Sequence, residues 1–338
     1  MILLFTNKND VHPTHVIQYL NAWGVPIFRL NSESLLTDYR FAWWANTEDC
    51  DFVIQNIKNG LTCIGHEITA IWERRPEIPK ELALQSPYEK VNKLNLDEAH
   101  EFLSFIRYYL KDVYSIGSIV EDRPAASKML QLSVARELGV SIPDTCFANN
   151  KEAMFRLANN YKSLSLKPIG DNYVTLDDEN EYIFFSKKIK SEELLQQPEE
   201  AFTQTVSFVQ NYVEKAYELR ITVINESVIA CKIDSQLQDD DKGKIDWRQG
   251  YDYNLKHEIV EIPERIRQFC LRFLDKMKLH FGCFDFIVTP AGEYVFLECN
   301  PNGQWMWIEL ETGYDISRVI AENLCKYENI GKNKKQTK

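Results

Sequence analysis

Apolar and polar positions along the chain predict strands and helices in alternation. Residues 2–6 are mostly apolar, and the apolar residues after them recur at helical spacing up to Gly24. A second apolar stretch follows directly, and this strand–helix–strand opening is typical of a doubly wound domain. For the first part of the chain we expect strands at 2–6, 25–30, 41–44 and 70–72 and helices at 13–22 and 94–113. No Gly-x-Gly-x-x-Gly motif follows the first strand, so the fingerprint of a dinucleotide-binding domain is missing.

The second part of the chain mixes helices with hairpins. Asp122 is predicted to cap a helix that has Pro124 in its first turn and stops at Gly139. Beyond it we expect a helix at 155–161, strands at 163–167 and 202–213, a hairpin of 218–225 with 228–233, a helix at 263–279 and a hairpin over 283–300. The run Asp-Asp-Asp-Lys-Gly-Lys at 239–244 predicts a charged loop, and the polar end of the chain predicts a frayed tail.

Size, charge and cysteine content limit the classes of protein to which the chain can belong. Its 338 residues exceed one ordinary domain of about 150 residues, which predicts two or three lobes. A net charge of −11 argues against a nucleic-acid-binding protein, although a few local cations can still bind one nucleotide. No apolar run approaches the roughly 20 residues of a membrane span, and the apolar start is too short for a signal peptide. Eight cysteines form no Cys-x-x-Cys pair, which predicts reduced thiols and a cytoplasmic protein.

The hairpin over 283–300 brings two carboxylates together. If Ala291-Gly292 forms a two-residue loop, Asp285 lies directly opposite Glu298, and Asn300 projects from the same face two residues later. Cross-strand carboxylates repel each other, and a divalent cation with oxygen ligands removes that repulsion. The residues therefore suit magnesium, while a solvated polar face on a surface hairpin is the alternative.

Two lysines are candidate phosphate ligands. In the strand 163–167, alternation places Leu164 and Leu166 on one face and Lys167 on the other, with its serines. Lys128 lies one turn into its helix, and either lysine could reach a phosphate as a point charge. Each alone is better explained as an ordinary surface residue, so both become candidates only as part of a set.

A third group of candidates lies around 210–222. Glu218, Arg220 and Thr222 share one strand face, where an acid and an arginine suit ribose hydroxyls and phosphate oxygens, or form a surface ion pair. Arg248, in Asp-Trp-Arg after the charged loop, offers a further phosphate-binding guanidinium.

In order and spacing, these features resemble the ATP-grasp fold. The pattern comprises a lysine-bearing helix, a strand ending Leu-Lys-Pro, a Gln-x-x-Val segment, Glu-Leu-Arg, and Asp…Glu-x-Asn, over about residues 118–325. Within that fold, Glu-Cys-Asn-Pro-Asn-Gly-Gln-Trp-Met-Trp-Ile-Glu at 298–309 is similar to ligases that cyclise ribosomal peptides of the microviridin or graspetide class. Ile-Trp-Glu-Arg-Arg-Pro at 71–76 and Asp-Trp-Arg at 246–248 also resemble that family, particularly its grasp-with-spasm branch. The loop after Lys167 departs from many ATP-grasp proteins in carrying a single glycine.

The resemblance implies a domain order and a ligand set. It implies an α/β chain with a small doubly wound domain at 1–117, a central ATP-grasp subdomain at 118–209, a C-terminal subdomain at 210–330 and the frayed tail at 331–338. For ATP it implies Lys128 and Lys167 at the α/β-phosphates and adenine edge, Gln210, Tyr212 and Val213 along the adenine, and Glu218 at the ribose. For Mg²⁺ it implies Asp285, Glu298 and Asn300, and for the transferring phosphoryl group Arg220 and Arg248.

The activity implied by the resemblance is ATP-dependent ligation. The carboxylate of an Asp or Glu side chain in a precursor peptide is phosphorylated, and a Thr or Ser hydroxyl or a Lys amine of the same peptide then attacks to give an ester or an amide. Arg74 and Arg75 are candidates for docking the acidic peptide, or else form a structural ion pair between lobes. Alternatives are an amino-acid ligase acting on a protein or small molecule, and a nucleotide-binding regulator without turnover. The resemblance also implies a homodimer.

Overall fold

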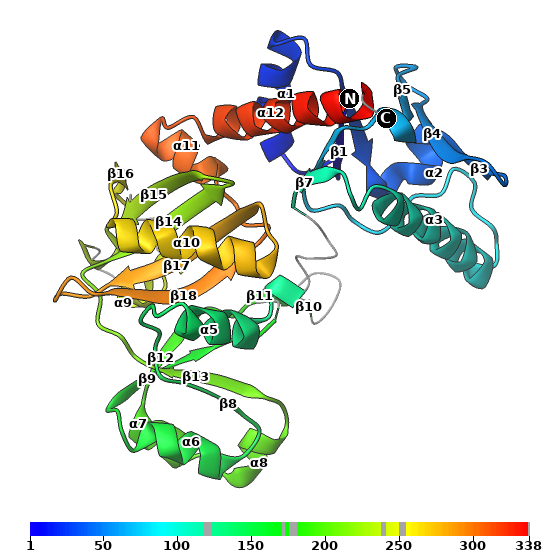
Figure 1. Ribbon diagram of the computed structural model, residues 1–338. Helices are drawn as coiled ribbons and strands as arrows, with labels where there is room; N and C mark the ends of the chain where they lie inside the picture. The colour runs from blue at the N-terminus through cyan, green and yellow to red at the C-terminus, as the bar shows by residue number, and fades with distance from the viewer. Residues whose placement is uncertain (118–123, 171–172, 176–180, 238–240, 250–254, 337–338) are drawn as a thin grey trace.

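The computed structural model describes residues 1–117, 124–170, 173–175, 181–237, 241–249 and 255–336, which form three lobes (Figure 1). The helices are α1 (His12–Ala22), α2 (Leu35–Asp38), α3 (Glu89–Tyr109), α5 (Lys128–Glu137), α6 (Lys151–Ala158), α7 (Ser191–Leu195), α8 (Glu199–Thr203), α9 (Asp241–Ile245), α10 (Glu264–Met277), α11 (Met306–Thr312) and α12 (Ile316–Gln336). Among the described residues, no helix combines the length and the apolar character needed to cross a bilayer.

The strands build five sheets within the described part of the chain. They are β1 (Ile2–Thr6), β2 (Ile27–Asn31), β3 (Tyr39–Ala45), β4 (Cys50–Asn56), β5 (Thr62–Ile64), β6 (Ala70–Glu73), β7 (Tyr114–Ile116), β8 (Thr145–Ala148), β9 (Ser163–Lys167), β10 (Tyr173–Thr175), β11 (Glu181–Ile183), β12 (Lys187–Lys190), β13 (Ser207–Asn211), β14 (Tyr217–Ile224), β15 (Ser227–Ile233), β16 (His257–Val260), β17 (Phe281–Val288) and β18 (Tyr294–Asn300).

The N-terminal lobe is a parallel sheet in the order β2-β1-β6-β7 with helices on both faces. Strand β1 is buried along its whole length because both faces are covered. Its Leu3 and Phe5 pack against α3, while Ile2 and Leu4 pack against α1 and α12. The doubly wound arrangement expected from the first residues is therefore confirmed. A separate antiparallel sheet, β3-β4-β5, extends this lobe.

The last helix of the chain packs against the N-terminal lobe. Helix α12 follows the large sheet in sequence but lies beside α1 in the N-terminal lobe (Figure 1). Asn323 accepts a hydrogen bond from Asn225 of the large sheet (2.8 Å), so α12 contacts both lobes. The helix continues to Gln336, and the prediction of a frayed tail from residue 331 is therefore wrong over 331–336.

The large sheet, β16-β15-β14-β17-β18, is antiparallel and has two different faces. One face is apolar: Leu219, Ile221 and Val223 of β14 pack with α10 and α5. The period of two then places Glu218, Arg220 and Thr222 on the opposite face. The small sheet, β12-β9-β13-β8, packs its apolar face against α6, α7 and α8.

Several expected elements differ in their bounds: the helices expected at 94–113 and 155–161 are α3 and α6, each of which begins and ends about four residues earlier, and two other elements differ for a physical reason. Helix α5 begins at Lys128 with Ser127 as its N-cap, whose hydroxyl accepts from the Leu130 N–H, and Asp122 lies outside the described residues. The strand expected over 202–213 is two elements, because Phe202 belongs to α8 and β13 starts only at Ser207. Phe202 is apolar because it fills the core under α6, a reason that applies equally to a helix and a strand.

Candidate active site

The carboxylate pair predicted on the second hairpin is present. Asp285 in β17 lies opposite Glu298 in β18. The turn differs from the expected one, because Thr289 pairs with Glu293 across a three-residue loop (Thr289 N–H to Glu293 O, and Glu293 N–H to Thr289 Oγ1). A β-bulge between Asp285 and Phe286 then shifts the register by one residue and restores the Asp285–Glu298 pair.

Arg220 neutralises the first carboxylate. It lies opposite Asp285 on the neighbouring strand β14, and its Nη1 donates to both Asp285 oxygens at 2.9 and 2.8 Å. Burial raises the pKa of Asp285, and the guanidinium opposes that rise. The Arg220 Nη2 also donates to the Gln304 carbonyl at 3.2 Å. The ion pair therefore connects β14 and β17 with the segment that follows β18.

Lys128 neutralises the second carboxylate. Its ammonium donates to Glu298 Oε2 from the first turn of α5. Burial disfavours the ionised form of Glu298, but the charge and hydrogen bond of Lys128, with Lys167 and Arg248 farther away, outweigh burial and hold its pKa well below the usual range.

A buried glutamine fixes α5 against β18. Gln131 lies one turn after Lys128, and its side-chain amide bonds the backbone of Cys299 in both directions: Nε2 donates to Cys299 O at 2.6 Å and Oε1 accepts from Cys299 N at 2.9 Å. The same Nε2 donates to the Ala125 carbonyl at 2.7 Å. Because Cys299 follows Glu298 directly, this amide sets the distance between Lys128 and the carboxylate. No sequence signal marked Gln131, since only the folded chain brings it to β18.

Lys167 ends β9 on the polar face of the small sheet, as the alternation predicted. It is half-buried, and burial lowers its pKa to about 8, with Lys128 and Lys215 adding to the lowering and Glu298 and Glu218 opposing it. The end of β9 is therefore close enough to Glu298 and Glu218 of the large sheet for their charges to act on Lys167.

Glu218 is held by a lysine that the sequence did not single out. The Lys215 Nζ donates to Glu218 Oε1 at 2.8 Å and to the Ile245 carbonyl at 2.9 Å, and both side chains are almost fully buried. Burial raises the pKa of Glu218, and Lys215 opposes that rise. The pair is a buried one rather than the surface ion pair with Arg220 that the sequence left open.

The segment 210–213 connects the two sheets. Gln210 is a buried residue at the centre of the small sheet, and its side chain donates to Thr145 Oγ1 at 3.0 Å. The Tyr212 N–H donates to the Ser163 carbonyl at 3.0 Å, its ring lies under the Lys188 ammonium at 3.7 Å, and Val213 is half-buried.

Arg248 is oriented by its neighbour Asp246. Its Nε and Nη2 donate to the two Asp246 oxygens at 2.8 and 2.6 Å, and the carboxylate also accepts from the Ser186 N–H at 3.1 Å. The hydrogen bond that Arg248 donates to Asp246 keeps the pKa of Arg248 above its ordinary value. The Asp-Trp-Arg motif therefore supplies both a cation and the residue that holds it beside the end of the small sheet.

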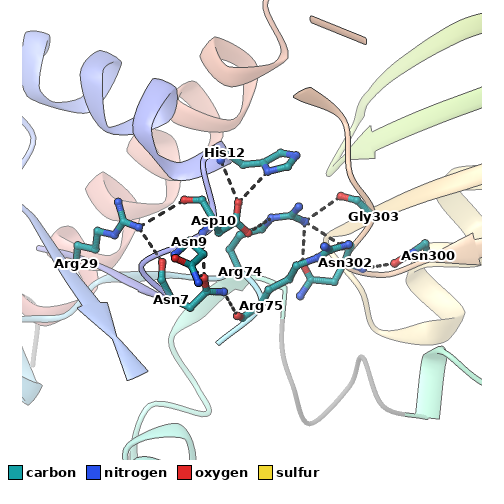
Figure 2. A network of polar contacts seen from close by, with 10 residues as sticks. All are labelled: Asn7, Asn9, Asp10, His12, Arg29, Arg74, Arg75, Asn300, Asn302 and Gly303. Carbon is teal, nitrogen blue, oxygen red and sulfur yellow. Dashed lines mark hydrogen bonds and ion pairs between the residues drawn. The ribbon is translucent and has the colours of Figure 1, made fainter. Parts of the chain in front are cut away.

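The two arginines of the Arg-Arg-Pro motif lie in different environments. Arg74 is buried and bonds Asp10 in its own lobe and the loop 301–305 after β18 (Figure 2). Arg75 is exposed, has a positive φ of 47°, and its carbonyl accepts from the Asn7 side chain at 2.7 Å. Arg74 thus corresponds to the structural contact between lobes that the sequence left open as an alternative. Arg75 is exposed, although its Nε also donates to the Asn302 carbonyl at 3.4 Å.

A family comparison identifies this arrangement of lobes. The RimK-like ATP-grasp domain matches residues 125–324, which is more than half of the chain. The chain belongs to the RimK-like ATP-grasp family. The predicted fold class, an ATP-grasp fold preceded by a small doubly wound domain, is thereby confirmed. No curated protein matches the chain.

Solved structures of similar shape cover nearly the whole chain. A RiPP-associated ATP-grasp ligase of Chryseobacterium gregarium, in complex with ADP and a leader and core peptide, has a TM-score of 0.85 and 26% identity over 96% of each chain. The macrocyclase MdnC of Microcystis aeruginosa MRC, bound with the precursor peptide MdnA, has a TM-score of 0.80 and 27% identity over 96% of this chain and 99% of the other. The macrocyclase MdnB of the same organism, at 23% identity, a TM-score of 0.73 and coverage of 96% and 98%, shows the same fold.

The side-chain oxygen atoms of this site suit a Mg²⁺ ion that is also bound by the phosphates of a nucleotide. Among the described residues, no group of three or more His, Cys, Asp or Glu side chains is arranged to hold a metal by itself. Asp285 and Glu298 supply two carboxylates and Asn300 an amide oxygen, which matches the way Mg²⁺ binds through one or two carboxylates plus substrate phosphates. Lys128, Lys167, Arg220 and Arg248 provide the surrounding positive charge, since all four act on the Glu298 or Asp285 carboxylate.

Proposed function

We propose that the chain is an ATP-dependent ligase that cross-links side chains of a ribosomally made precursor peptide. The observation that carries this proposal is the match over 96% of the chain to a ligase holding ADP with a leader and core peptide, at a TM-score of 0.85. The macrocyclase bound to its precursor peptide adds a second relative of the same kind at nearly full length. The acidic and basic residues between the two sheets supply the charges that such a reaction needs.

In the proposed reaction an Asp or Glu carboxylate of the peptide is first activated. A carboxylate oxygen attacks the γ-phosphorus of ATP and ADP leaves, which gives an acyl phosphate. A Thr or Ser hydroxyl then attacks the carbonyl carbon to form an ester, or a Lys amine to form an amide, and phosphate leaves. The nucleophile gives up its proton in that step, so each bond removes the elements of one water from the peptide.

Each candidate residue has a task in this reaction. Lys128 and Lys167 hold the α/β-phosphates, and Gln210, Tyr212 and Val213 line the adenine. Glu218, oriented by Lys215, receives the ribose hydroxyls. Arg220 and Arg248 face the phosphoryl group in transfer, and Asp285, Glu298 and Asn300 hold Mg²⁺. Mg²⁺ held there would supply positive charge that stabilises the phosphoryl group during its transfer.

The peptide and the assembly complete the proposal. Arg75 is the docking residue that remains for an acidic peptide, because it is exposed while Arg74 is enclosed by protein. We expect a homodimer, and we expect the reaction in the cytoplasm, where ATP is available and the eight free cysteines stay reduced.

An intact-mass measurement tests the proposal. The chain is co-expressed with the short acidic, Thr- or Lys-containing reading frames beside its gene, and with Glu298→Gln as the matched inactive control. We expect the peptide to lose one or more waters with the wild-type chain only, and mild base to reverse the loss if the bonds are esters. A peptide that gains the mass of an amino acid instead indicates an amino-acid ligase. No mass change, despite ADP binding, indicates a regulator.

A further inference from the structure

A buried arginine of the N-terminal lobe reaches the loop that follows the metal-binding strand. The Arg74 backbone N–H donates to the Phe5 carbonyl at 2.8 Å, which fixes the residue at the end of β6. Its side chain is only 2% exposed and leaves the lobe. From there Nη1 donates to the Asn302 carbonyl, the Asn302 Oδ1 and the Gly303 carbonyl, each at 2.9 Å (Figure 2).

Arg74 is held firmly from its own lobe. Its Nε donates to Asp10 Oδ2 at 3.0 Å. The other Asp10 oxygen accepts from the His12 N–H at 3.0 Å and lies 2.8 Å from the His12 Nδ1, at the start of α1. Burial lowers the pKa of Arg74 to about 10, and Asp10 opposes that fall, so the guanidinium stays charged at neutral pH.

The two residues whose oxygens accept from Arg74 also bond Asn300 through their backbone N–H groups. The Asn302 N–H donates to Asn300 Oδ1 at 3.0 Å, and the Gly303 N–H donates to the Asn300 carbonyl at 3.2 Å. A carboxamide oxygen has two lone pairs, so one remains for a cation after the Asn302 bond is made. The direction of that lone pair depends on where Asn302 sits.

The loop has little room to move between its two guanidiniums. On its other side Arg220 holds the Gln304 carbonyl. A Cβ on Gly303 would lie 2.4 Å from the Cβ of Cys283 and 2.8 Å from the Arg220 Nη2, so only glycine permits this approach. Because the loop is this closely packed, its backbone and Asn300 are positioned together by Arg74 on one side and Arg220 on the other.

We propose that Arg74 is a positioning residue that orients Asn300 and thereby sets the Mg²⁺ affinity of the nucleotide site. The inference rests on the proposed function, since it assigns Asn300 as a magnesium ligand. Replacing a residue behind a metal ligand commonly costs about 10–100-fold in metal affinity. We expect a loss of that size when Arg74 no longer bridges the lobes.

The test measures binding rather than turnover. Arg74→Lys keeps the charge but replaces the planar fork by a single ammonium. The matched control is Arg107→Lys, because Arg107 is a half-buried arginine of the same lobe whose described contacts are Glu73 (3.6 Å) and the Phe5 ring (4.5 Å). ADP binding is followed by calorimetry at increasing Mg²⁺ concentration for the wild type and both variants, and cooperative thermal unfolding confirms that each is folded.

The outcomes separate this inference from the proposed function. We expect the half-saturating Mg²⁺ concentration to rise about tenfold or more in Arg74→Lys, with metal-free ADP binding unchanged, and to stay at the wild-type value in Arg107→Lys. An unchanged half-saturating Mg²⁺ concentration in folded Arg74→Lys, or an equal rise in both variants, overturns the role of Arg74 but not the proposed ligase function. Wild-type ADP binding that does not depend on Mg²⁺ overturns both the role of Arg74 and the proposed function. If Arg74→Lys does not fold, Asp10→Asn takes its place, because it removes the carboxylate charge from behind Arg74, and the same shift is expected at smaller size.

Discussion

Lys167 should make nucleotide binding depend on pH in the mildly alkaline range. Burial, with Lys128 and Lys215, lowers its pKa from 10.5 to about 8, against the opposing effect of Glu298 and Glu218. At about 1.4 kcal/mol per pKa unit, this lowering means that the charged form of Lys167 is disfavoured by about 3 kcal/mol in the free protein. Phosphate oxygens beside the ammonium favour its charged form, so the pKa should return toward 10.5 in the complex.

The direction of the pH dependence follows from the pKa of Lys167 in the free protein and in the complex. Below about pH 8 Lys167 is protonated in both states, and affinity does not change. Above it the free protein loses the proton while the complex keeps it, so binding takes up a proton and affinity falls as pH rises. At about pH 9 only about one tenth of the free protein carries the charge, which predicts about tenfold weaker ADP binding than at about pH 7.

Calorimetry of ADP binding at constant Mg²⁺ measures both the affinity and the proton uptake. Affinity is recorded at about pH 7, 8 and 9, and buffers of different ionisation enthalpy report the proton uptake. Lys167→Arg should remove the pH dependence, because a guanidinium stays charged throughout. The surface variant Lys276→Arg should keep the pH dependence, since Lys276 is exposed and pairs with Glu137 at the C-terminal end of α5. A wild-type affinity that changes less than about twofold from pH 7 to 9, or proton uptake that persists in Lys167→Arg, would refute the assignment.

Three substitutions test other parts of the site. Asp285→Asn should lower ATP turnover more than about 100-fold in a folded protein, because replacing even a residue behind a metal ligand lowers activity about 10–100-fold. Unchanged turnover in an ADP-release assay contradicts the magnesium assignment. Gln131→Met should lower the free energy of unfolding by about 2–3 kcal/mol in urea denaturation, because it leaves both backbone groups of Cys299 unpaired and buried; a neutral effect means that the loop can reorganise. Gly303→Ala should lower the free energy of unfolding by about 1–3 kcal/mol and slow turnover, because the added Cβ displaces Arg220. Stability and turnover that both stay at the wild-type values would show that the loop can accommodate the Cβ.

The central part of the site could be predicted from local sequence because it lies within single hairpins and strands. The alternation in 163–167 gave both the bounds of β9 and the side of Lys167. The pairing of Asp285 with Glu298 was also predicted correctly, although two departures cancelled: the loop is one residue longer than assumed, and a bulge compensates. Side-chain spacing of two restricts the register to one of two sets, which limits how far such an assumption can fail.

Contacts between residues that are far apart in the sequence could not be predicted in the same way. Arg74 and Asn302 are 228 residues apart, and Gln131 and Cys299 are 168 apart. Their residue types fit a solvated surface equally well, and only the packing of the lobes decides the matter. The Arg-Arg-Pro motif illustrates the limit: the sequence offered peptide docking or a contact between lobes for both arginines, whereas the fold buries Arg74 and leaves Arg75 exposed.

The charge distribution explains how an acidic protein can hold a polyphosphate. A net charge of −11 repels a nucleotide, but at physiological salt that repulsion is screened beyond about 8 Å. Affinity then depends on cations inside the site, and each of these is fixed by a different lobe or strand. Lys128 comes from α5, Lys167 from the small sheet and Arg220 from the large sheet. Their convergence requires these parts to be held in place: Arg74 ties the N-terminal lobe to the loop after β18, and Gln131 ties α5 to β18. Substitutions in these two ties should therefore affect ligand affinity more than their distance from the phosphates alone suggests.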